Sequence, residues 1–389
     1  MSFRYSTQTI SKKNIADVSK VLKSDFLTQG PKTVKFEKKI KTLVKCKYAL
    51  ATNSGSSSLL LACKSLSLKT GDLFWTVPNS FLATANCGIL CGFKIDFVDI
   101  DPNTWNISLE NLETKLIIAK KKKKLPKLII VVHLGGLPIN PIKLKNLSKK
   151  YKFKIIEDAS HSFGGKYYSN RVGCSKWSDI TVFSFHPVKV ITTGEGGCCV
   201  TNNKQYYERL TALRNNGIVR DKKNFKFKNL GPWYYEQHSI GYNFRMSDIQ
   251  SALGISQLKN LNSFLKKRNE IASYYKDNLE ELPITFQNVE EDFYSTYHLF
   301  IIKLDIQLKK LHSKFFNYLR SKKILVNLHY LPIHLQPFYR KYGFKKNAFP
   351  VSEEYAETAI SIPIYPNLKK KEQKKIINII KLFFKKYAK

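Results

Sequence analysis

Between residues 47 and 202, short apolar runs alternate with segments of helical periodicity. In chain order the runs read YALAT, LFWTVP, KIDFVDI, KLIIVVH, KFKIIEDA, DITVFSF and GGCCVTN. Strands that alternate with helices in this way usually pair in parallel, and the helices then cover both faces of the sheet. The pattern therefore predicts an α/β fold with a mainly parallel central sheet.

After about residue 259 the sequence changes to long, basic amphipathic helices and two strand-like segments, YHLFIIKL near 297–304 and ILVNLHY near 324–330. We expect an N-terminal segment and large domain over residues 1–258 and a smaller α+β domain over residues 259–389. A chain of 389 residues, 43% of them hydrophobic, is long enough for two such cores. The basic C-terminal segment KKIINIIKLFFKKYAK fits core packing of the small domain better than a helix on a membrane surface.

The formal net charge is +37, from 66 basic and 29 acidic residues. Such an excess attracts polyanions, which include nucleic acid, anionic membranes and phosphorylated small molecules. Most of the cations are scattered lysines, whereas arginine reads base edges best, so a solvated lysine-rich surface is favoured over nucleic-acid binding.

Seven cysteines at irregular spacings, without a Cys-x-x-Cys pair or a zinc-ligand pattern, predict buried free thiols in a reducing compartment and no metal site. The N-terminus lacks an apolar signal core, and no apolar run reaches the length of a membrane helix. We therefore expect a soluble, cytoplasmic protein.

In open α/β sheets ligands bind beyond the carboxyl ends of the strands, so the residues that follow each strand indicate the chemistry. After Thr52 a Gly-Ser-rich turn leads into a helix near Ser56. Free amides at a helix N-terminus bind phosphate, although the same stretch could be a serine cap without a ligand. After the next strand, Pro78 and Asn79 precede Phe81, an aromatic that either stacks on a planar ring or fills the core.

Two further strand ends carry ionisable groups. Glu157 and Asp158 end a buried strand, with His161 close behind. A carboxylate at the tip of an apolar strand needs a partner, such as a cation or a protonated ring nitrogen, unless it is a hydrogen-bonded turn residue. The strand DITVFSF is followed by Lys189, between apolar neighbours and before a Gly-Glu-Gly-Gly turn.

Lys189 is either one surface lysine among many or a partly desolvated amine with a lowered pKa that forms Schiff bases. A phosphate cradle, an aromatic plate, a carboxylate and such a lysine, in this order on one sheet, meet the requirements of pyridoxal phosphate. A nicotinamide site is not indicated, because HLGGLP at 133–138 lacks the spacing G-x-G-x-x-G.

The segments SDFLTQGPKTVKFEKKI, SFHPVKVITTGEGG, GYNFRMSDIQSALGISQL and AISIPIYPNL resemble the DegT/DnrJ/StrS-type sugar aminotransferases, and the resemblance covers nearly the whole chain. It implies the fold type I architecture of pyridoxal phosphate-dependent transferases, which is that of aspartate aminotransferase. Together with VNLHYLPIHLQPFYR, these segments are most similar to the members that act in pseudaminic acid synthesis. Those members aminate C4 of a UDP-linked 4-keto-6-deoxy-N-acetylhexosamine, and glutamate is the usual donor of the family.

The resemblance implies a role for individual residues. Lys189 matches the Schiff-base lysine, and Asp158 matches the residue that faces the pyridine nitrogen. The phosphate would be held by Ser184 with the amides of Ser56 and Ser57, and the ring would be flanked by Phe81 and His161. A lysine at 189 favours transamination, because related dehydratases carry histidine there. Ser56, Ser57 and Ser58 depart from the usual Thr-x-Ala of the family, but they keep a hydroxyl.

The resemblance also implies a homodimer with shared active sites, in which Asn243 reaches the phosphate of the neighbouring subunit. Segments that contact the nucleotide sugar match Tyr5, Asp25, Phe26, Leu27, Thr28, Leu328, His329 and Tyr330. Two alternatives stay open. One is the same reaction on a different 4-keto nucleotide sugar, and the other is an inactive polyanion-binding protein that keeps the fold.

Overall fold

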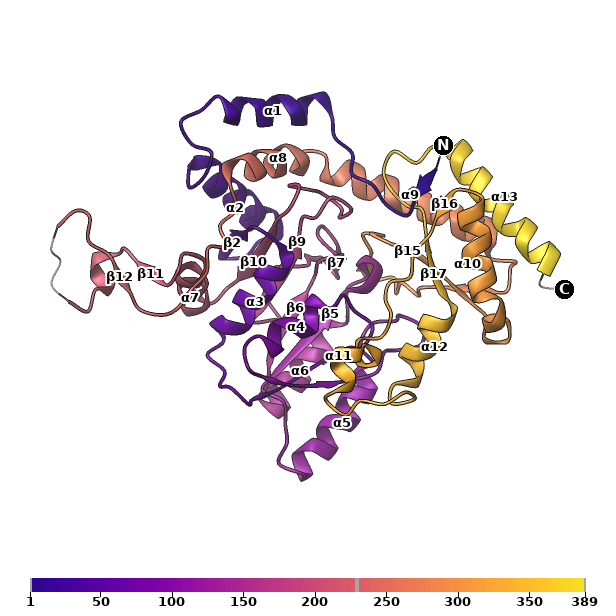
Figure 1. Ribbon diagram of the computed structural model, residues 1–389, viewed down its shortest axis with the longest axis horizontal. Helices are drawn as coiled ribbons and strands as arrows, with labels where there is room; N and C mark the ends of the chain where they lie inside the picture. Colours follow the sequence, from indigo (N-terminus) through magenta and orange to yellow (C-terminus); the bar gives the residue numbers. More distant parts are fainter. Residues whose placement is uncertain (1, 228–230, 388–389) are drawn as a thin grey trace.

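The computed structural model of the protein describes residues 2–227 and 231–387 (Figure 1). Its largest sheet has seven strands in the order β2–β10–β9–β6–β5–β3–β4. The strands are β2 (Tyr48–Thr52), β3 (Leu73–Thr76), β4 (Lys94–Phe97), β5 (Leu128–Val132), β6 (Lys154–Asp158), β9 (Ile180–Ser184) and β10 (Gly197–Thr201). Each of the seven apolar runs supplies one of them. Only β10 is antiparallel to its neighbours, which confirms the mainly parallel sheet.

Helices cover both faces of this sheet, as the alternation predicted. Successive side chains of a strand point to opposite faces, so Val182 and Phe183 of β9 lie in different core clusters. The cluster around Val182 includes residues of α3 (Gly55–Ser65), α4 (Ala83–Ile89) and α7 (Lys204–Arg214). The opposite face packs against α2 (Pro31–Val44), α5 (Leu109–Lys121) and α6 (Pro141–Tyr151). The helix α8 (Asp248–Leu258) lies between α2 and α1 (Lys12–Leu22).

The C-terminal part contains a three-stranded antiparallel sheet in the order β13–β15–β17. Its elements are α9 (Leu261–Leu279), β13 (Ile284–Phe286), β15 (Phe300–Leu304), α10 (His312–Ser321), α11 (Pro337–Arg340), α12 (Pro350–Thr358), β17 (Ala359–Ile362) and α13 (Lys370–Tyr387). Ile376, Ile380 and Phe384 of α13 are buried in the same cluster as Phe300 of β15. The amphipathic C-terminal helix therefore packs its apolar face into a core.

The second strand expected in this part differs from the prediction. Of residues 324–330 only Ile324–Leu325 form a strand, β16, and it pairs in parallel with β1 (Phe3–Arg4). Beyond β16, Asn327 forms an isolated bridge with Ser361, and Val326 and His329 are buried. The first strand of the chain thus lies beside C-terminal elements (Figure 1), and the division at residue 258 stays a prediction.

The remaining strands form small additions. A three-stranded sheet contains β7 (Lys166–Tyr167), β8 (Asn170–Arg171) and β14 (Phe293–Tyr294). The pair β11 (Ile218–Val219) and β12 (Glu236–Gln237) forms an arm that projects beyond α7 at the left of Figure 1. Phe227, Trp233 and Ile240 of this arm are 75%, 72% and 86% exposed. An arm with so much exposed apolar surface is typical of a contact with another protein surface.

Six of the seven cysteines are buried, Cys91 is partly exposed, and all seven are free thiols.

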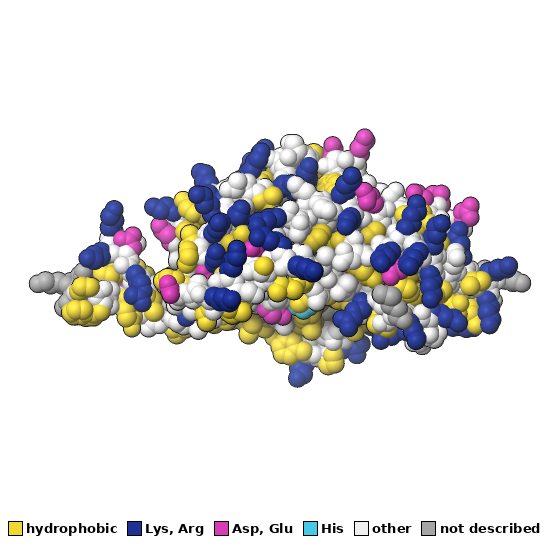
Figure 2. Space-filling model, turned by 90° about the horizontal axis from the view of Figure 1, so that it is seen from above, with side chains coloured by type: hydrophobic (Ala, Val, Ile, Leu, Met, Phe, Trp, Pro, Cys, Tyr) yellow, Lys and Arg dark blue, Asp and Glu magenta, His cyan; other side chains and the backbone are white. Residues whose placement is uncertain are grey.

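Within the described residues no helix is long and apolar enough to cross a membrane. Among those same residues, no group of three or more His, Cys, Asp or Glu side chains could hold a metal ion. Figure 2 shows lysines and arginines spread along the whole visible face rather than gathered in one patch.

Candidate active site

A cavity of about 620 Å³ lies at the carboxyl ends of the central strands. Val132, Asp158 and Ser184, which line it, are the last residues of β5, β6 and β9. The cavity is also lined by the following residues of the predicted site: Tyr5, Ser56, Phe81, His161, Lys189, Leu328, His329 and Tyr330. The chain therefore brings most of the predicted residues together at one edge of the sheet.

Lys189 lies in the loop that joins β9 to β10. The loop is closed at its base by hydrogen bonds from the Phe185 amide to the Gly196 carbonyl (2.8 Å) and from the Thr193 amide to the Phe185 carbonyl (3.0 Å). Val190, the next residue, is buried in the core. Because the backbone on both sides is fixed, the lysine side chain starts from a defined position in the cavity wall.

Burial lowers the pKa of Lys189 to about 8, and the nearby charge of Asp158 offsets part of this effect. Desolvation disfavours the ammonium form, so a large fraction of the amine is neutral in mildly alkaline solution. A neutral amine is the form that attacks carbonyl groups and accepts protons. Among the many lysines of the chain, this one is suited to covalent chemistry.

The lowered pKa predicts an effect on stability. Because the folded state disfavours the charged amine, Lys189→Met should raise the free energy of unfolding of the ligand-free protein at pH 7 by roughly 1–3 kcal/mol. The wild type recovers stability as the pH rises from about 8 to 10.5, the ordinary value, so the difference should shrink across that window. Urea denaturation at pH 7 and pH 10 measures it. Lys176→Met, at an exposed lysine, is the control, and a difference that stays constant with pH would contradict the prediction.

Asp158 is 5% exposed and receives three hydrogen bonds. Its Oδ1 accepts from the amide (3.2 Å) and the hydroxyl (2.6 Å) of Ser160, and its Oδ2 accepts from the hydroxyl of Thr84 (2.6 Å). Among the described residues no Lys, Arg or His forms an ion pair with it, although a buried carboxylate normally has a cationic partner. The negative charge is thus available to a cationic group of a ligand in the cavity.

The first turn of α3 forms an anion-binding corner beside β9. Ser54 caps the helix, and its hydroxyl accepts from the amide of Ser57 (3.0 Å). The amides of Gly55 and Ser56 have no acceptor among the described residues, and both residues line the cavity. A Cβ on Gly55 would lie 2.8 Å from the Cβ of Ser184, so only glycine lets the strand end approach these amides. Two free donors at a helix N-terminus suit a phosphate group.

This corner corrects two details of the prediction. The helix begins at Gly55, one residue earlier than expected, because Ser54 and not a later serine is the cap. The amide of Ser57 was expected to bind phosphate, but it donates to that cap, and Ser57 does not line the cavity. Gly55, which was not predicted, lines the cavity beside Ser56.

His161 and Phe81 both contact Tyr330. His161 Nε2 lies 3.1 Å from the Tyr330 hydroxyl, and the ring centroids of Phe81 and Tyr330 are 6.1 Å apart. Burial, together with the charge of Lys189, holds the pKa of His161 well below its usual range, so this ring is neutral. Its Nδ1 is buried without a partner among the described residues. The aromatic wall is therefore uncharged and suited to a planar ligand.

The N-terminal segment closes one side of the cavity. The rings of Tyr5 and His329 have centroids 4.9 Å apart, and the hydroxyl of Ser6 donates to the carbonyl of Val188 (3.0 Å). Leu328 and Asn327 complete this wall. The predicted sugar-contacting residues Tyr5 and 328–330 thus line the same cavity as Asp158 and Ser184.

Besides Ser57, five predicted residues do not line the cavity within one chain. Asp25, Phe26, Leu27 and Thr28 are all exposed beside the start of α8, where the Leu27 carbonyl accepts from the amide of Asp248 (2.9 Å). Asn243 is also exposed and forms a backbone bridge with Asn215. Any contact of these residues with a ligand would have to be made in a neighbouring subunit.

Thr84 and Ser160, the two donors to Asp158, were not predicted. Ser160 follows Asp158 by two residues, so the familiar tendency of aspartate to bond the backbone two positions on could have indicated it. Thr84 is 74 residues away in sequence, and the only local signal is a Ser-x-x-x-Thr spacing with Ser80. His186 and Glu195 also line the cavity. Both belong to the segment SFHPVKVITTGEGG, but no role was predicted for either residue.

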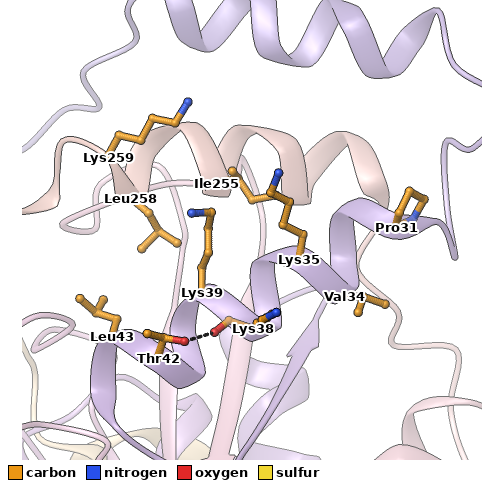
Figure 3. A pocket seen from close by; sticks show the side chains of 10 residues that line it. All are labelled: Pro31, Val34, Lys35, Lys38, Lys39, Thr42, Leu43, Ile255, Leu258 and Lys259. Carbon is orange, nitrogen blue, oxygen red and sulfur yellow. Dashed lines mark hydrogen bonds between the residues drawn. The ribbon is translucent and has the colours of Figure 1, made fainter.

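A second, larger cavity of about 890 Å³ lies between α2 and α8 (Figure 3). It is lined by Pro31, Val34, Lys35, Lys38, Lys39, Thr42, Leu43, Ile255, Leu258 and Lys259. None of these ten side chains is buried, so the space is an open groove. It contains no carboxylate, histidine or desolvated amine. The smaller cavity around Lys189 is therefore the candidate active site.

Comparison with known proteins identifies the family of the chain. The DegT/DnrJ/EryC1/StrS aminotransferase family matches residues 8–381. The chain is 35% identical over 372 residues to the UDP-4-amino-4,6-dideoxy-N-acetyl-beta-L-altrosamine transaminase of Campylobacter jejuni subsp. jejuni serotype O:23/36, covering 95% of this chain and 94% of the relative. It is 30% identical to the GDP-perosamine synthase of Escherichia coli O157:H7, with 94% of each chain covered.

Among solved structures, the fold is similar to that of Helicobacter pylori PseC, an aminotransferase involved in the biosynthesis of pseudoaminic acid. The TM-score is 0.91 at 30% identity, and each chain is covered completely. Similarity of this extent includes both the central sheet and the C-terminal elements.

Proposed function

The chain belongs to the DegT/DnrJ/EryC1/StrS aminotransferase family and is a sugar aminotransferase. On this premise we propose that it uses pyridoxal phosphate to aminate C4 of a UDP-linked 4-keto-6-deoxy-N-acetylhexosamine, with glutamate as the amino donor. One observation carries the proposal: one cavity is lined by a partly desolvated lysine, by two helix amides and by a buried carboxylate, and within the described residues these amides have no acceptor and this carboxylate has no ion pair.

The cavity fits the cofactor. The amides of Gly55 and Ser56 and the hydroxyl of Ser184 would bind its phosphate, and Asp158 would accept a hydrogen bond from its protonated ring nitrogen. Phe81 and His161 would flank the ring, and Lys189 would attach to it covalently. When bound, pyridoxal phosphate supplies an electron sink for a carbanion next to the amine. Each of these groups lines the cavity.

The residues of the chain supply the proton transfers and the orientation. Lys189 would remove a proton from the cofactor's methylene carbon and return a proton at C4 of the sugar. Its pKa of about 8 suits an amine that must both accept and donate a proton. Asp158 would fix the ring nitrogen in its charged form. The neutral His161 would pack on the ring without competing for that charge. The walls formed by Tyr5, Phe81 and Tyr330 would exclude water from the reacting carbon.

The amino acceptor is the less constrained part of the proposal. The names of the relatives include both a UDP-linked and a GDP-linked sugar, so similarity alone supports more than one nucleotide. The segments resembling enzymes of pseudaminic acid synthesis favour the UDP sugar, as does the structural similarity to PseC over the complete chain. The competing candidate is the same reaction on a different 4-keto nucleotide sugar.

A substrate panel tests the proposal. The purified protein is incubated with glutamate and one of three ketosugars: UDP-2-acetamido-2,6-dideoxy-β-L-arabino-hex-4-ulose, its C5 epimer, or a GDP-linked 4-keto-6-deoxyhexose. Mass spectrometry of the products should show amination of the first compound alone. Amination of only the C5 epimer or only the GDP sugar would refute the substrate and leave the transaminase assignment standing. Lys189→Ala, which should give no product with any of them, is the control.

A further inference from the structure

Asp158 is the end of a buried chain of hydroxyl groups. The Thr84 hydroxyl donates to Asp158 Oδ2 (2.6 Å), and the hydroxyls of Ser80 and Thr84 are 2.7 Å apart. Ser80 is 2% exposed, Thr84 is 0% exposed and Asp158 is 5% exposed. Ser80 also lines the cavity. These hydrogen bonds therefore connect Ser80, in the cavity wall just before α4, with Asp158 at the end of β6.

The direction of these hydrogen bonds follows from the donors available. An ionised carboxylate only accepts, so the single hydrogen of the Thr84 hydroxyl is used on Asp158. The contact between Ser80 and Thr84 must then be made with the hydrogen of Ser80. Both hydroxyls thus point their hydrogens toward Asp158, and a charge-assisted hydrogen bond of this kind is stronger than a neutral one.

The two oxygens of Asp158 differ in their remaining capacity. Each carboxylate oxygen accepts about two hydrogen bonds. Oδ1 is saturated, because it accepts from both the amide and the hydroxyl of Ser160. Oδ2 accepts only from Thr84 and keeps one free position. A ring N–H in the cavity therefore has Oδ2, and not Oδ1, as its acceptor.

We propose that Thr84 is a positioning residue, which holds Oδ2 of Asp158 as the oxygen that receives the pyridine N–H. The proposal rests on the proposed cofactor, since it assigns a role toward the ring nitrogen. Thr84 touches neither cofactor nor substrate directly, because it does not line the cavity. Without the Thr84 hydroxyl, Oδ2 would lose its one hydrogen-bond partner among the described residues. The carboxylate would then be held through Oδ1 alone, and Oδ2 could swing away from the ring nitrogen.

A purely structural role for Thr84 makes a different prediction. Thr84 lies in the first turn of α4, and the sulfur of Cys87 donates to its carbonyl. If the hydroxyl served only to stabilise this helix, its removal would weaken cofactor binding to the same degree whether or not Asp158 was present. If it acts through Asp158, the effect disappears when Asp158 is removed. A double-mutant cycle separates the two cases.

The test measures the dissociation constant of pyridoxal phosphate by titrating the cofactor-free protein and following protein fluorescence. Thr84→Val keeps the shape and removes the donor, and it should weaken binding about 10- to 100-fold, as expected for a hydrogen bond to a charged group. Thr84→Ser keeps the hydroxyl and should stay within about threefold of the wild type. In an Asp158→Ala background, Thr84→Val should change the constant less than about twofold.

Three results would overturn the proposal: wild-type affinity in Thr84→Val, an equal loss in Thr84→Ser, or a full additional loss in the Asp158→Ala background. If Thr84→Val does not fold, as judged by its thermal unfolding, the same double-mutant cycle is measured with Thr84→Ala and with Ser80→Ala. Their results then decide the proposal. Failure of the wild type to bind pyridoxal phosphate would instead refute the proposed cofactor, so the two failures are distinguishable.

Discussion

Lys189→Ala is expected to abolish transamination and covalent retention of pyridoxal phosphate while leaving the fold intact. The loss should be at least about 10³-fold in kcat/KM, because the amine supplies both the covalent anchor and the proton transfer. The fold should persist because the side chain lines a cavity and the loop is held by its backbone and by Val190. No other lysine lines that cavity, so none within the described residues could substitute for it.

The measurement combines activity with chemical trapping. Borohydride reduction of the wild type loaded with pyridoxal phosphate should fix the cofactor to one peptide, and mass spectrometry should identify Lys189 as its site. The matched control is Lys38→Ala, at an exposed lysine of the groove in Figure 3, and it should keep wild-type activity and labelling. Labelling that persists in Lys189→Ala, or that is lost in Lys38→Ala, would contradict the assignment of the cavity around Lys189, and not the groove in Figure 3, as the active site.

The central sheet and half of the site could be read from the sequence because parallel strands are buried on both faces. Buried strands appear as continuous apolar runs, and the first polar residue marks the edge where ligands bind. Asp158 and Ser184 end such runs, and Lys189 lies in the loop that follows one of them, so their places were predictable. The resemblance to a known family then assigned a role to each of them.

The sequence did not predict what depends on contacts between distant segments. Thr84 contacts Asp158 only because the first turn of α4 lies beside the end of β6, and the segment 324–330 shortens to β16 because its partner is the two-residue β1. The free amide of Gly55 depends on Ser54 being the cap, a choice among four serines that local propensity does not resolve. Such details depend on which distant segments pack together in the fold, and a local sequence pattern does not show this.

The placement of Asn243 has a further consequence, because it is exposed and lies outside the cavity of its own chain. Its backbone pairs with Asn215, just before β11, and the exposed Phe227, Trp233 and Ile240 of the arm would be covered by a second copy of the chain. We propose a homodimer in which Asn243 completes the phosphate site of the partner. A residue that acts in the other subunit can be tested by mixing two defective chains.

Coexpression of Lys189→Ala and Asn243→Ala chains should therefore restore activity that neither homodimer has. In a mixed dimer, one of the two sites combines Lys189 of one chain with Asn243 of the other, so random pairing should recover up to about a quarter of wild-type activity. The assay is run at limiting pyridoxal phosphate, where loss of a phosphate contact weakens the Asn243→Ala homodimer most. If both residues served the same subunit, no mixed dimer would contain an intact site, and the mixture would not exceed the average of the two homodimers.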